Sequence, residues 1–484
     1  MTIPRAADES TAQASAGYSG PPVAWAGGMD RSGSEVSNVI VIGGGVSGLA
    51  TAHELLRADP SADVVVLEAT DRLGGNVRTL RRDGAIIDLG PDAVLNSRKE
   101  AIALCGSLGL GDALIQPEEA SRSVLIATDG KLQPLPEGLV FGVPSKLGQL
   151  ISTPLLSWRG KLRAALDLLL PATEPGSTSV GELIGRRLGT EVKERLVEPL
   201  VGAVYAADID RLDAAVGLPF AAAAKGSLVR AMARAPRGTG SPFRAPANGM
   251  SELVDALVRA VGTERIRTGS GVASVRAVDG AWQVALRDGT TLTAPQLVLA
   301  VPPHEAAAMV AETDGTLGDA LREIGATTTA TVILAFPPGT ELPQASGVLI
   351  PRSEGRPTIA ATFVHRKWGR PNPTGAVVIR AFLGGGRNPA LIDASDDAEL
   401  VRLALVDLRA FMELPEPLWT TVARWVRATP HPAPGHHARM QSVRALLAER
   451  PGLHVVGAAY EGPGIAGCAA QAARTAAKIA PAKS

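Results

Sequence analysis

Three glycines with the spacing Gly-x-Gly-x-x-Gly, at positions 43, 45 and 48, stand between an apolar run and a helical pattern. Gly43 allows a tight turn, Gly45 lets backbone amides approach a pyrophosphate, and Gly48 lets the helix pack against the strand. Val46 and Ser47 open the helix, whose unpaired N–H groups and dipole favour negative charge. These residues predict a dinucleotide site, and an ordinary glycine-rich turn is the alternative.

A carboxylate and a second pair of glycines follow. An apolar strand over 63–67 ends at Glu68, 20 residues beyond Gly48, where the acidic residue that binds the adenosine ribose is expected. Glutamate there argues against a 2′-phosphate. The next residues of the group are Arg72, Gly74, Gly75 and Asn76. NAD needs no second glycine pair, and this pair resembles the motif that lies along the pyrophosphate and ribityl chain in FAD enzymes of the amine-oxidase superfamily. We therefore expect FAD.

The composition excludes several classes of protein. The 484 residues suffice for two or three domains, and 48 basic residues against 48 acidic ones give no global field that would attract nucleic acid. Two cysteines fit neither a disulfide framework nor a metal site, so we expect a reducing compartment and no metal. No uncharged apolar window is long enough to span a bilayer. Residues 1–36 lack the apolar core of a signal peptide and predict a disordered leader.

The segment after the second glycine pair carries a more specific resemblance. A strand over 84–89 leads into Gly90, Pro91 and Asp92, and the basic residue Arg98 follows before a helix. This arrangement resembles the FAD-dependent protoporphyrinogen and coproporphyrinogen oxidases. The resemblance implies that Gly90, Pro91 and Asp92 line the flavin and that Arg98 meets a substrate propionate, which a guanidinium can hold in a bidentate pair. A solvated basic residue ahead of a helix is the alternative.

Later stretches resemble the same family. Residues 198–208, Glu-Pro-Leu-Val-Gly-Ala-Val-Tyr-Ala-Ala-Asp, closely resemble the family pattern "EPL…G(I/V)YAGD". The C-terminal run contains Gly457, Gly464 and Ile465 in a motif that, in the family, puts a helix N-terminus against the flavin pyrimidine. The resemblance also implies that the backbone at Val272 packs against adenine.

The remaining segments predict a substrate domain and a helical block. We expect strands over 328–336, 347–350, 359–363 and 377–383, a helix over 396–411, and a loop over 425–436. Phe363, Trp368 and Arg380 are the pocket candidates, although core packing explains the aromatic residues equally well. A helix over 147–170 carries basic residues within its apolar run. It suits a membrane interface, and a helix packed on its own domain would look the same.

These assignments predict an α/β fold with a discontinuous Rossmann-like FAD-binding domain, a mixed-sheet substrate domain and a helical insertion. The predicted order is a leader over 1–36, FAD-binding parts over 37–95, 246–305 and 446–484, substrate parts over 96–125, 226–245 and 306–445, and the insertion over 126–225.

The resemblance implies an oxygen-dependent FAD oxidase that aromatises a porphyrinogen, coproporphyrinogen III or protoporphyrinogen IX, in haem biosynthesis. Flavin N5 would take hydride from a methylene bridge, and dioxygen would reoxidise the flavin with release of peroxide, so no catalytic side chain is predicted. The stretches 147–170 and 205–208 favour the bacterial coproporphyrinogen type. We expect a cytoplasmic protein, with peripheral contact to the inner face of the membrane and a homodimer both left open.

Two other hypotheses stay open. Amine oxidases of this fold carry a lysine near flavin N5, and 327–331 has none; residues 456–463 contain no cysteine for covalent flavin, so we expect non-covalent FAD. Pro432 stands where the porphyrinogen oxidases have an aromatic residue, and Ala466-Gly467 replaces their Pro-Asp. These departures leave room for a paralogous FAD-dependent oxidase or desaturase of another ring or amine. The third hypothesis, a flavin-binding relic without activity, is disfavoured because the motifs at both ends of the flavin are intact.

Overall fold

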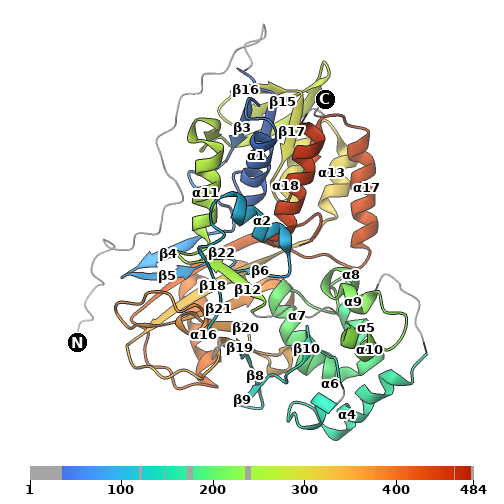
Figure 1. Ribbon diagram of the computed structural model, residues 1–484, viewed down its shortest axis with the longest axis vertical. Helices are drawn as coiled ribbons and strands as arrows, with labels where there is room; N and C mark the ends of the chain where they lie inside the picture. The colour runs from blue at the N-terminus through green and yellow to red at the C-terminus, as the bar shows by residue number, and fades with distance from the viewer. Residues whose placement is uncertain are drawn as a thin grey trace.

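The computed structural model describes residues 35–118, 123–146, 148–171, 178–234, 241–462 and 464–480, and shows two lobes joined by several strands and loops (Figure 1). The predicted leader lies outside the described residues up to position 34. Its last two residues do not belong to a leader, because Glu35–Val36 forms strand β1, which pairs in parallel with β16 (Thr291–Ala294). None of the described helices is long and apolar enough to cross a membrane.

A five-stranded parallel sheet forms the centre of the upper lobe. Its strand order is β13 (Ile266–Arg267), β3 (Val64–Leu67), β2 (Val39–Ile42), β17 (Gln296–Leu299) and β23 (Leu453–Val455). The strands come from three separate parts of the chain, as predicted for a discontinuous nucleotide-binding domain. Of the sheet's three inner strands, β2 and β3 are wholly buried, which explains their continuous apolar runs.

Helices and a meander cover the two faces of this sheet. Val39 and Val41 pack against the helices on one face, and Ile40 and Ile42 face the other, because side chains alternate along a strand. The first face carries α1 (Val46–Ala58), α2 (Lys99–Ser107), α11 (Ser251–Val261) and α18 (Ile465–Ile479). The second carries β14 (Val272–Val278), β15 (Ala281–Leu286), β16, α12 (Pro303–Val310), α13 (Gly315–Arg322) and α17 (His436–Ala448).

The lower lobe contains a seven-stranded mixed sheet. Its order is β22 (Trp419–Pro430), β18 (Ala326–Phe336), β21 (Val377–Gly384), β20 (Thr358–Phe363), β19 (Gly347–Leu349), β8 (Leu125–Thr128) and β9 (Lys131–Pro134). The four strands predicted over 328–383 are confirmed, as is the helix α16 (Asp397–Arg409) that packs on the sheet. The predicted loop over 425–436 is wrong in its first half, because residues up to Pro430 continue β22.

The helical block lies beside this sheet and has its own apolar core. Its helices include α5 (Val180–Leu188), α7 (Glu198–Tyr205), α8 (Ala214–Gly217), α9 (Pro219–Ala222) and α10 (Leu228–Arg234). The single helix predicted over 147–170 is wrong. The segment forms α3 (Gly148–Ile151), α4 (Trp158–Ala165) and a 3-10 turn over Leu166–Leu168, and Pro154 lies in the break. The hairpin β8–β9 belongs to the mixed sheet, so the insertion begins later than position 126.

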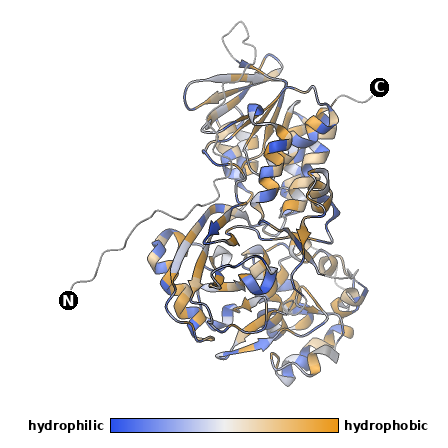
Figure 2. Cartoon of the chain, turned by 60° about the vertical axis from the view of Figure 1, so that its left-hand side comes forward, coloured by the Kyte–Doolittle hydropathy of each residue, from blue (hydrophilic) through white to orange (hydrophobic). Residues whose placement is uncertain are grey.

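Hydropathy follows this layering. The strands of both lobes are coloured mostly as apolar, and many helices carry apolar and polar residues along the same length (Figure 2). This is the pattern expected of sheets buried between layers and of helices that cover them.

Candidate active site

The glycine-rich turn joins β2 to α1 at the carboxyl edge of the parallel sheet. Gly43 has a φ of +112°, and a Cβ there would lie 2.6 Å from the carbonyl oxygen of Ala300. A Cβ on Gly48 would lie 2.0 Å from the carbonyl oxygen of Gly43, so helix α1 could not pack this closely against the end of strand β2. Gly45 differs, because the nearest atom to its Cβ position is the Cα of Gly75 at 3.9 Å. The structure therefore needs glycine at two of these positions and leaves space at the third.

Helix α1 begins at this turn without a side-chain cap. Gly45 is the N-cap residue, and the N-cap position therefore provides no side-chain hydrogen bond to the first amides of the helix. Val46 and Ser47 follow in the first turn, where backbone N–H groups lack helical partners. The first turn is therefore suited to an anion.

Glu68 stands at the end of β3, beside the glycine turn. Its Oε2 accepts a hydrogen bond of 2.9 Å from the amide of Gly44, and its Oε1 accepts from the amide and hydroxyl of Thr70 at 2.9 and 2.8 Å. These bonds fix the carboxylate next to the turn. Val272 is buried at the start of β14, the strand that follows β13.

The second glycine pair lies against the first motif. The amide of Gly74 donates to the carbonyl oxygen of Gly44 at 2.8 Å, and Gly45 and Gly74 form a parallel bridge. The guanidinium of Arg72 donates to the carbonyl oxygens of Leu73 and Val77 at 3.0 and 3.1 Å, and to that of Gly75. The side chain of Arg72 therefore fixes the backbone conformation of this loop.

Asn76 and Gly90 connect this loop to the mixed sheet. The side-chain amide of Asn76 donates to the carbonyl oxygen of Ala428 in β22 at 3.1 Å. A Cβ on Gly90 would lie 1.9 Å from the carbonyl oxygen of Asn76 and 3.6 Å from the ring of Trp425. The predicted cofactor loops and the end of β22 are thus in direct contact.

Asp92 carries the densest set of polar contacts at the lobe junction. Its carboxylate accepts from Lys367 at 2.8 and 3.0 Å and forms an ion pair of 2.8 Å with Arg380. Burial alone would raise the pKa of Asp92, but the charges of Lys367 and Arg380 hold it well below its usual range. Pro91 is exposed between Gly90 and Asp92. The contacts with Lys367 and Arg380 show that the Asp92 carboxylate binds side chains of the protein itself.

The three predicted pocket residues of the substrate domain belong to this support. Arg380, only 3% exposed, donates to the carbonyl oxygen of Gly90 at 2.6 Å as well as pairing with Asp92. Trp368 is 4% exposed, and its indole N–H lies 3.4 Å from Asp92. Phe363 is fully buried within the core of the mixed sheet. Their placement corrects the expectation of a pocket lining, because these side chains are enclosed by the protein itself.

Arg98 lies near the helical block, close to Tyr205. It is exposed at the start of α2, and its guanidinium forms no ion pair with the part of the chain that the structure describes. Burial raises the pKa of Tyr205, and the positive charge of Arg98 partly offsets this, which places the two side chains near one another. The two stretches that resemble the porphyrinogen oxidases therefore meet here.

The stretch 198–208 is anchored on the mixed sheet. Glu198 accepts two hydrogen bonds from Arg387, of 2.7 and 2.9 Å, and a third from the amide of Arg352 at 3.1 Å. Ala206 has a φ of +47°, and its carbonyl oxygen accepts from the amide of Gly386 at 2.8 Å. These contacts fix the end of α7 opposite Arg98.

Sequence analysis missed Arg370, which joins the two lobes. Its guanidinium pairs with Asp88 at 2.7 Å and donates to the carbonyl oxygen of Pro246 at 3.0 Å, and both charged side chains are buried. Arg370 follows Trp368 by two residues, yet only its partner in β5 (Ala85–Asp88), far away in the sequence, reveals its role. No local signal could have found it.

The C-terminal motif brings a second helix N-terminus to the same edge. Gly464 is the N-cap of α18, has no side-chain cap, and has no atom within 4 Å of its Cβ position. Ile465 begins the helix and is buried. In the same first turn, the Cys468 thiol lies against Ser47 of α1. Two uncapped helix starts therefore converge beside the glycine turn.

A further contact fixes Gly457 at the end of β23. The side chain of Gln471 accepts from its amide at 3.2 Å and donates to its carbonyl oxygen at 2.9 Å. The loop before α18 is thereby tied to the second turn of the helix.

These residues fit FAD. The open Cβ positions of Gly45 and Gly464 lie at two helix starts that favour phosphate and a negatively charged ring, and Glu68 is held where a ribose hydroxyl could reach it. A parallel sheet with this turn, joined to a mixed sheet across the cofactor loops, defines a dinucleotide-binding oxidoreductase with a separate substrate domain.

Comparison with known proteins assigns the chain more closely. Residues 46–480 match the family model of flavin-containing amine oxidoreductases, and the chain belongs to that family. It is an FAD-dependent oxidoreductase. The chain is 32% identical over 452 residues to the coproporphyrinogen III oxidase of Bacillus subtilis, covering 89% of this chain and 95% of that protein. It is 34% identical over 444 residues to the Mycobacterium tuberculosis protein of the same name, covering 90% and 95%.

A solved structure supports the same fold. The crystal structure of a putative protoporphyrinogen oxidase from Exiguobacterium sp. 255-15 superposes with a TM-score of 0.82 at 29% identity and covers 94% of this chain and 99% of that one. The predicted α/β architecture is confirmed.

Proposed function

We propose that this protein oxidises a porphyrinogen to a porphyrin in haem biosynthesis, with coproporphyrinogen III as the preferred substrate. The observation that carries the proposal is its likeness, over nine-tenths of its length, to relatives named coproporphyrinogen III oxidase. The exposed guanidinium of Arg98 opposite Tyr205 supports it, because a carboxylate-bearing substrate needs a cation without an internal partner.

The side chains assigned to the cofactor act by positioning. We assign the pyrophosphate to the amides at Gly45, Val46 and Ser47, the ribose to Glu68, and the flavin ring to the start of α18. When bound, FAD would accept hydride from a ring methylene of the substrate and return the electrons to dioxygen.

A second set of side chains supports these contacts without touching the substrate. Arg380 and Lys367 hold Asp92, and with it the loop over 90–92, against the mixed sheet. Arg72 holds the loop of the second glycine pair.

The residue types on β18 favour this substrate class over amines. Thr328, Thr329 and Thr331 occupy the strand where amine oxidases carry a lysine, and the hydroxyl of Thr328 accepts from the amide of Arg427 at 3.1 Å. The paralogous oxidase of another ring or amine stays an outcome of the experiment. Dioxygen as acceptor and a homodimer are predictions that the same preparation can address.

The test is aerobic turnover of the FAD-loaded protein with coproporphyrinogen III and protoporphyrinogen IX in parallel, followed by porphyrin fluorescence and peroxide. We expect faster fluorescence growth with coproporphyrinogen III. Faster growth with protoporphyrinogen IX would overturn the preference. Growth no faster than autoxidation with both, while FAD is bound, would overturn the reaction.

We further propose that the protein touches a membrane surface through the segment over 158–169. Four of its apolar side chains are exposed, Trp158 by 67%, Leu162 by 67%, Leu166 by 47% and Leu169 by 81%. Their spacing of four, four and three residues puts them on one side of a helical segment. This segment lies at the end of the lower lobe farthest from the parallel sheet (Figure 1).

The polar residues of the segment suit an anionic surface. Arg159 is exposed and Lys161 is partly exposed beside the apolar side chains, although the Lys161 ammonium also donates to the carbonyl oxygen of Ile151 at 2.7 Å. The Ser157 hydroxyl caps the helix by accepting from the amide of Gly160 at 3.1 Å. Amphipathic helices with basic polar faces bind the interface of anionic bilayers.

Co-sedimentation with vesicles of phosphatidylcholine and phosphatidylglycerol tests the contact. The unaltered protein should sediment with the vesicles, and Leu162→Glu with Leu169→Glu should abolish this. Val406→Glu is the matched control, because Val406 is 51% exposed on α16, away from the segment. Equal sedimentation of all three proteins, or none for the unaltered protein, would refute the proposal.

A further inference from the structure

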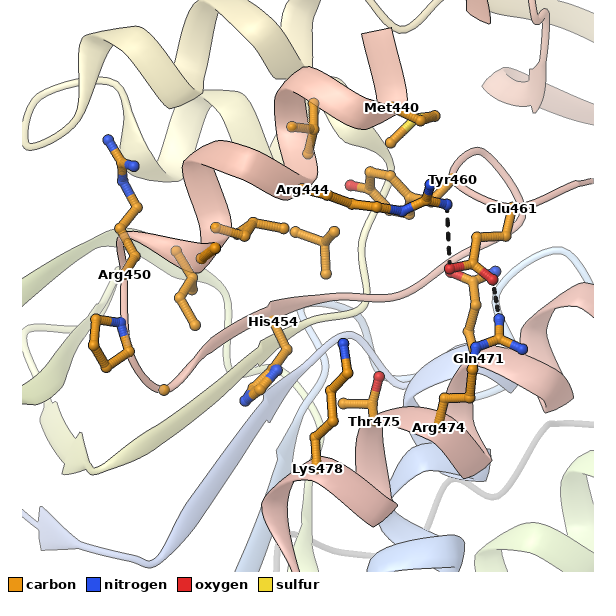
Figure 3. Close-up of a pocket in the computed structure, with 17 residues that line it drawn as sticks. Met440, Arg444, Arg450, His454, Tyr460, Glu461, Gln471, Arg474, Thr475 and Lys478 are labelled. Carbon is orange, nitrogen blue, oxygen red and sulfur yellow. Dashed lines mark hydrogen bonds and ion pairs between the residues drawn. The ribbon is translucent and has the colours of Figure 1, made fainter. Parts of the chain in front are cut away.

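A cavity of about 380 Å³ lies at the outer edge of the parallel sheet, between α17, β23 and α18 (Figure 3). None of the predicted cofactor or substrate residues lines it. Its apolar wall consists of Met440, Val443, Leu447, Ala448, Pro451, Leu453 and Val455. The size is within the range of small-molecule sites.

Basic side chains dominate the polar part of this edge cavity. Arg444, Arg450, Arg474 and Lys478 line it together with one carboxylate, Glu461. Glu461 is shared between Arg444, at 3.4 Å, and Arg474, as Figure 3 shows. Within the ranges that the structure describes, Lys478 forms no ion pair. The edge cavity therefore has an excess of positive charge.

Two of the lining side chains, Arg450 and His454, do not contribute to this excess charge. Arg450 is neutralised by Asp314 outside the cavity wall. Burial, with the nearby charge of Lys478, lowers the pKa of His454 to about 4, so its imidazole is neutral at pH 7. The uncompensated charge thus comes from Lys478 and from the two arginines that share Glu461.

A buried hydroxyl lies in the wall of the same cavity. Tyr460 lines the edge cavity, is 3% exposed, and its hydroxyl has no hydrogen-bond partner in the described part of the chain. Figure 3 shows the hydroxyl directed toward α17. Burial raises the pKa of Tyr460, so the phenol keeps its proton and can donate. A buried donor without a partner is costly unless something binds it.

We propose that the edge cavity is a binding site for a small organic anion, with one carboxylate or phosphate group and a short apolar body. Lys478 and Arg474 would hold the anionic group, the phenol of Tyr460 would donate to the ligand, and the apolar wall would cover its body.

The position of this site connects it to the candidate active site. Gln471, Arg474 and Lys478 lie on α18, the helix whose start we assign to the flavin. Gln471 lines the edge cavity and also holds both backbone groups of Gly457. An anion bound here would act on the end of β23 without entering the flavin site, which makes the site a candidate for regulation.

Isothermal titration calorimetry with phenyl phosphate and with inorganic phosphate tests the site. The FAD-loaded protein is used, so that the glycine turn is filled, and sodium chloride keeps the ionic strength constant. We expect phenyl phosphate to bind more tightly than phosphate. Lys478→Gln and Arg474→Gln should each raise the Kd for phenyl phosphate about ten-fold, because each removes a charge-assisted contact. Arg402→Gln is the control, because Arg402 lies on the exposed side of α16, and this variant should leave the Kd unchanged.

Tyr460→Phe separates ligand binding from structural stability. Removing an unpaired buried hydroxyl should leave the melting temperature of the ligand-free protein unchanged or higher, while the Kd for phenyl phosphate rises. A lower melting temperature with an unchanged Kd would show that the hydroxyl serves the fold and would overturn its assigned role. No binding of either probe, or equal binding by the Lys478→Gln, Arg474→Gln and control proteins, would overturn the site. These results do not depend on which substrate is oxidised.

Discussion

Alanine substitution should have different effects at Gly48 and Gly45: it should lower the stability of the protein at Gly48 and the affinity for FAD at Gly45. Alanine at Gly48 places Cβ 2.0 Å from the carbonyl oxygen of Gly43, and neither backbone can yield in a packed interior. We expect a loss of more than about 3 kcal/mol in the free energy of unfolding. Alanine at Gly45 meets nothing closer than 3.9 Å, and the φ of −74° suits any residue.

The Gly45→Ala apoprotein should therefore fold normally. A stabilisation of about 0.4–1 kcal/mol from the stiffer unfolded chain is offset by the poorer N-cap, so the net change should stay within about 0.5 kcal/mol. The new methyl group occupies space that we assign to the pyrophosphate. Overpacking of this kind costs about 1–3 kcal/mol, which lowers the FAD affinity about 5- to 150-fold.

Two measurements separate the effects. Urea unfolding of the apoproteins gives the stability, and titration with FAD, followed by quenching of its fluorescence, gives the affinity. The reasoning is refuted if Gly45→Ala binds FAD as tightly as the unaltered protein, or if its apoprotein is destabilised as much as that of Gly48→Ala.

The remaining predictions concern Asp92 and Arg98. Asp92→Asn should lower the free energy of unfolding at pH 7 by about 3–5 kcal/mol, because Arg380 stays buried without its partner; a change below about 1 kcal/mol in urea unfolding would contradict this. The pKa of Asp92 is lowered by folding, so its stabilisation is present above the unfolded value of about 3.9 and is lost as the pH falls below it. Stability measured from pH 5 downward should consequently fall less steeply in Asp92→Asn, and an unchanged slope would contradict the assignment. Arg98→Gln should raise KM for coproporphyrinogen III about ten-fold with little change in kcat, whereas Arg402→Gln should change neither; a fall in kcat alone would argue against a role in binding.

The sequence predicted the parts of the site that depend on local patterns. The glycine turn, the strand before Glu68 and the second glycine pair lie within one short stretch, and the structure brings them into contact. Whether these residues bind FAD as assigned stays a prediction. Local patterns sufficed because a strand, a turn and a helix that follow one another in the chain are also neighbours in space.

The errors have a common physical origin in contacts between distant segments. Phe363 and Trp368 were predicted as pocket residues. A strand such as β20, which is buried on both faces, looks the same in sequence whether it lines a cavity or a core. Trp368 is the last residue of helix α14 (Val364–Trp368), and its contact with the distant Asp92 is not visible in the local sequence. Similarly, residues 425–430 extend β22 past an irregularity at which Arg427 takes a φ of +46°. Each outcome depends on a partner far away in the chain.

The order of strands in the parallel sheet has a consequence for how the protein is made. β2 and β3 emerge early from the ribosome, β17 emerges past the middle of the chain, and β23 and α18 emerge last. The nucleotide-binding lobe cannot close until β23 and α18 have been synthesised, whereas the helical block, which is continuous over most of its length, can form earlier. Pairing across such separations makes folding slow and leaves sheet edges open to association meanwhile. Nascent chains halted before position 453 should therefore depend on chaperones and fail to retain FAD.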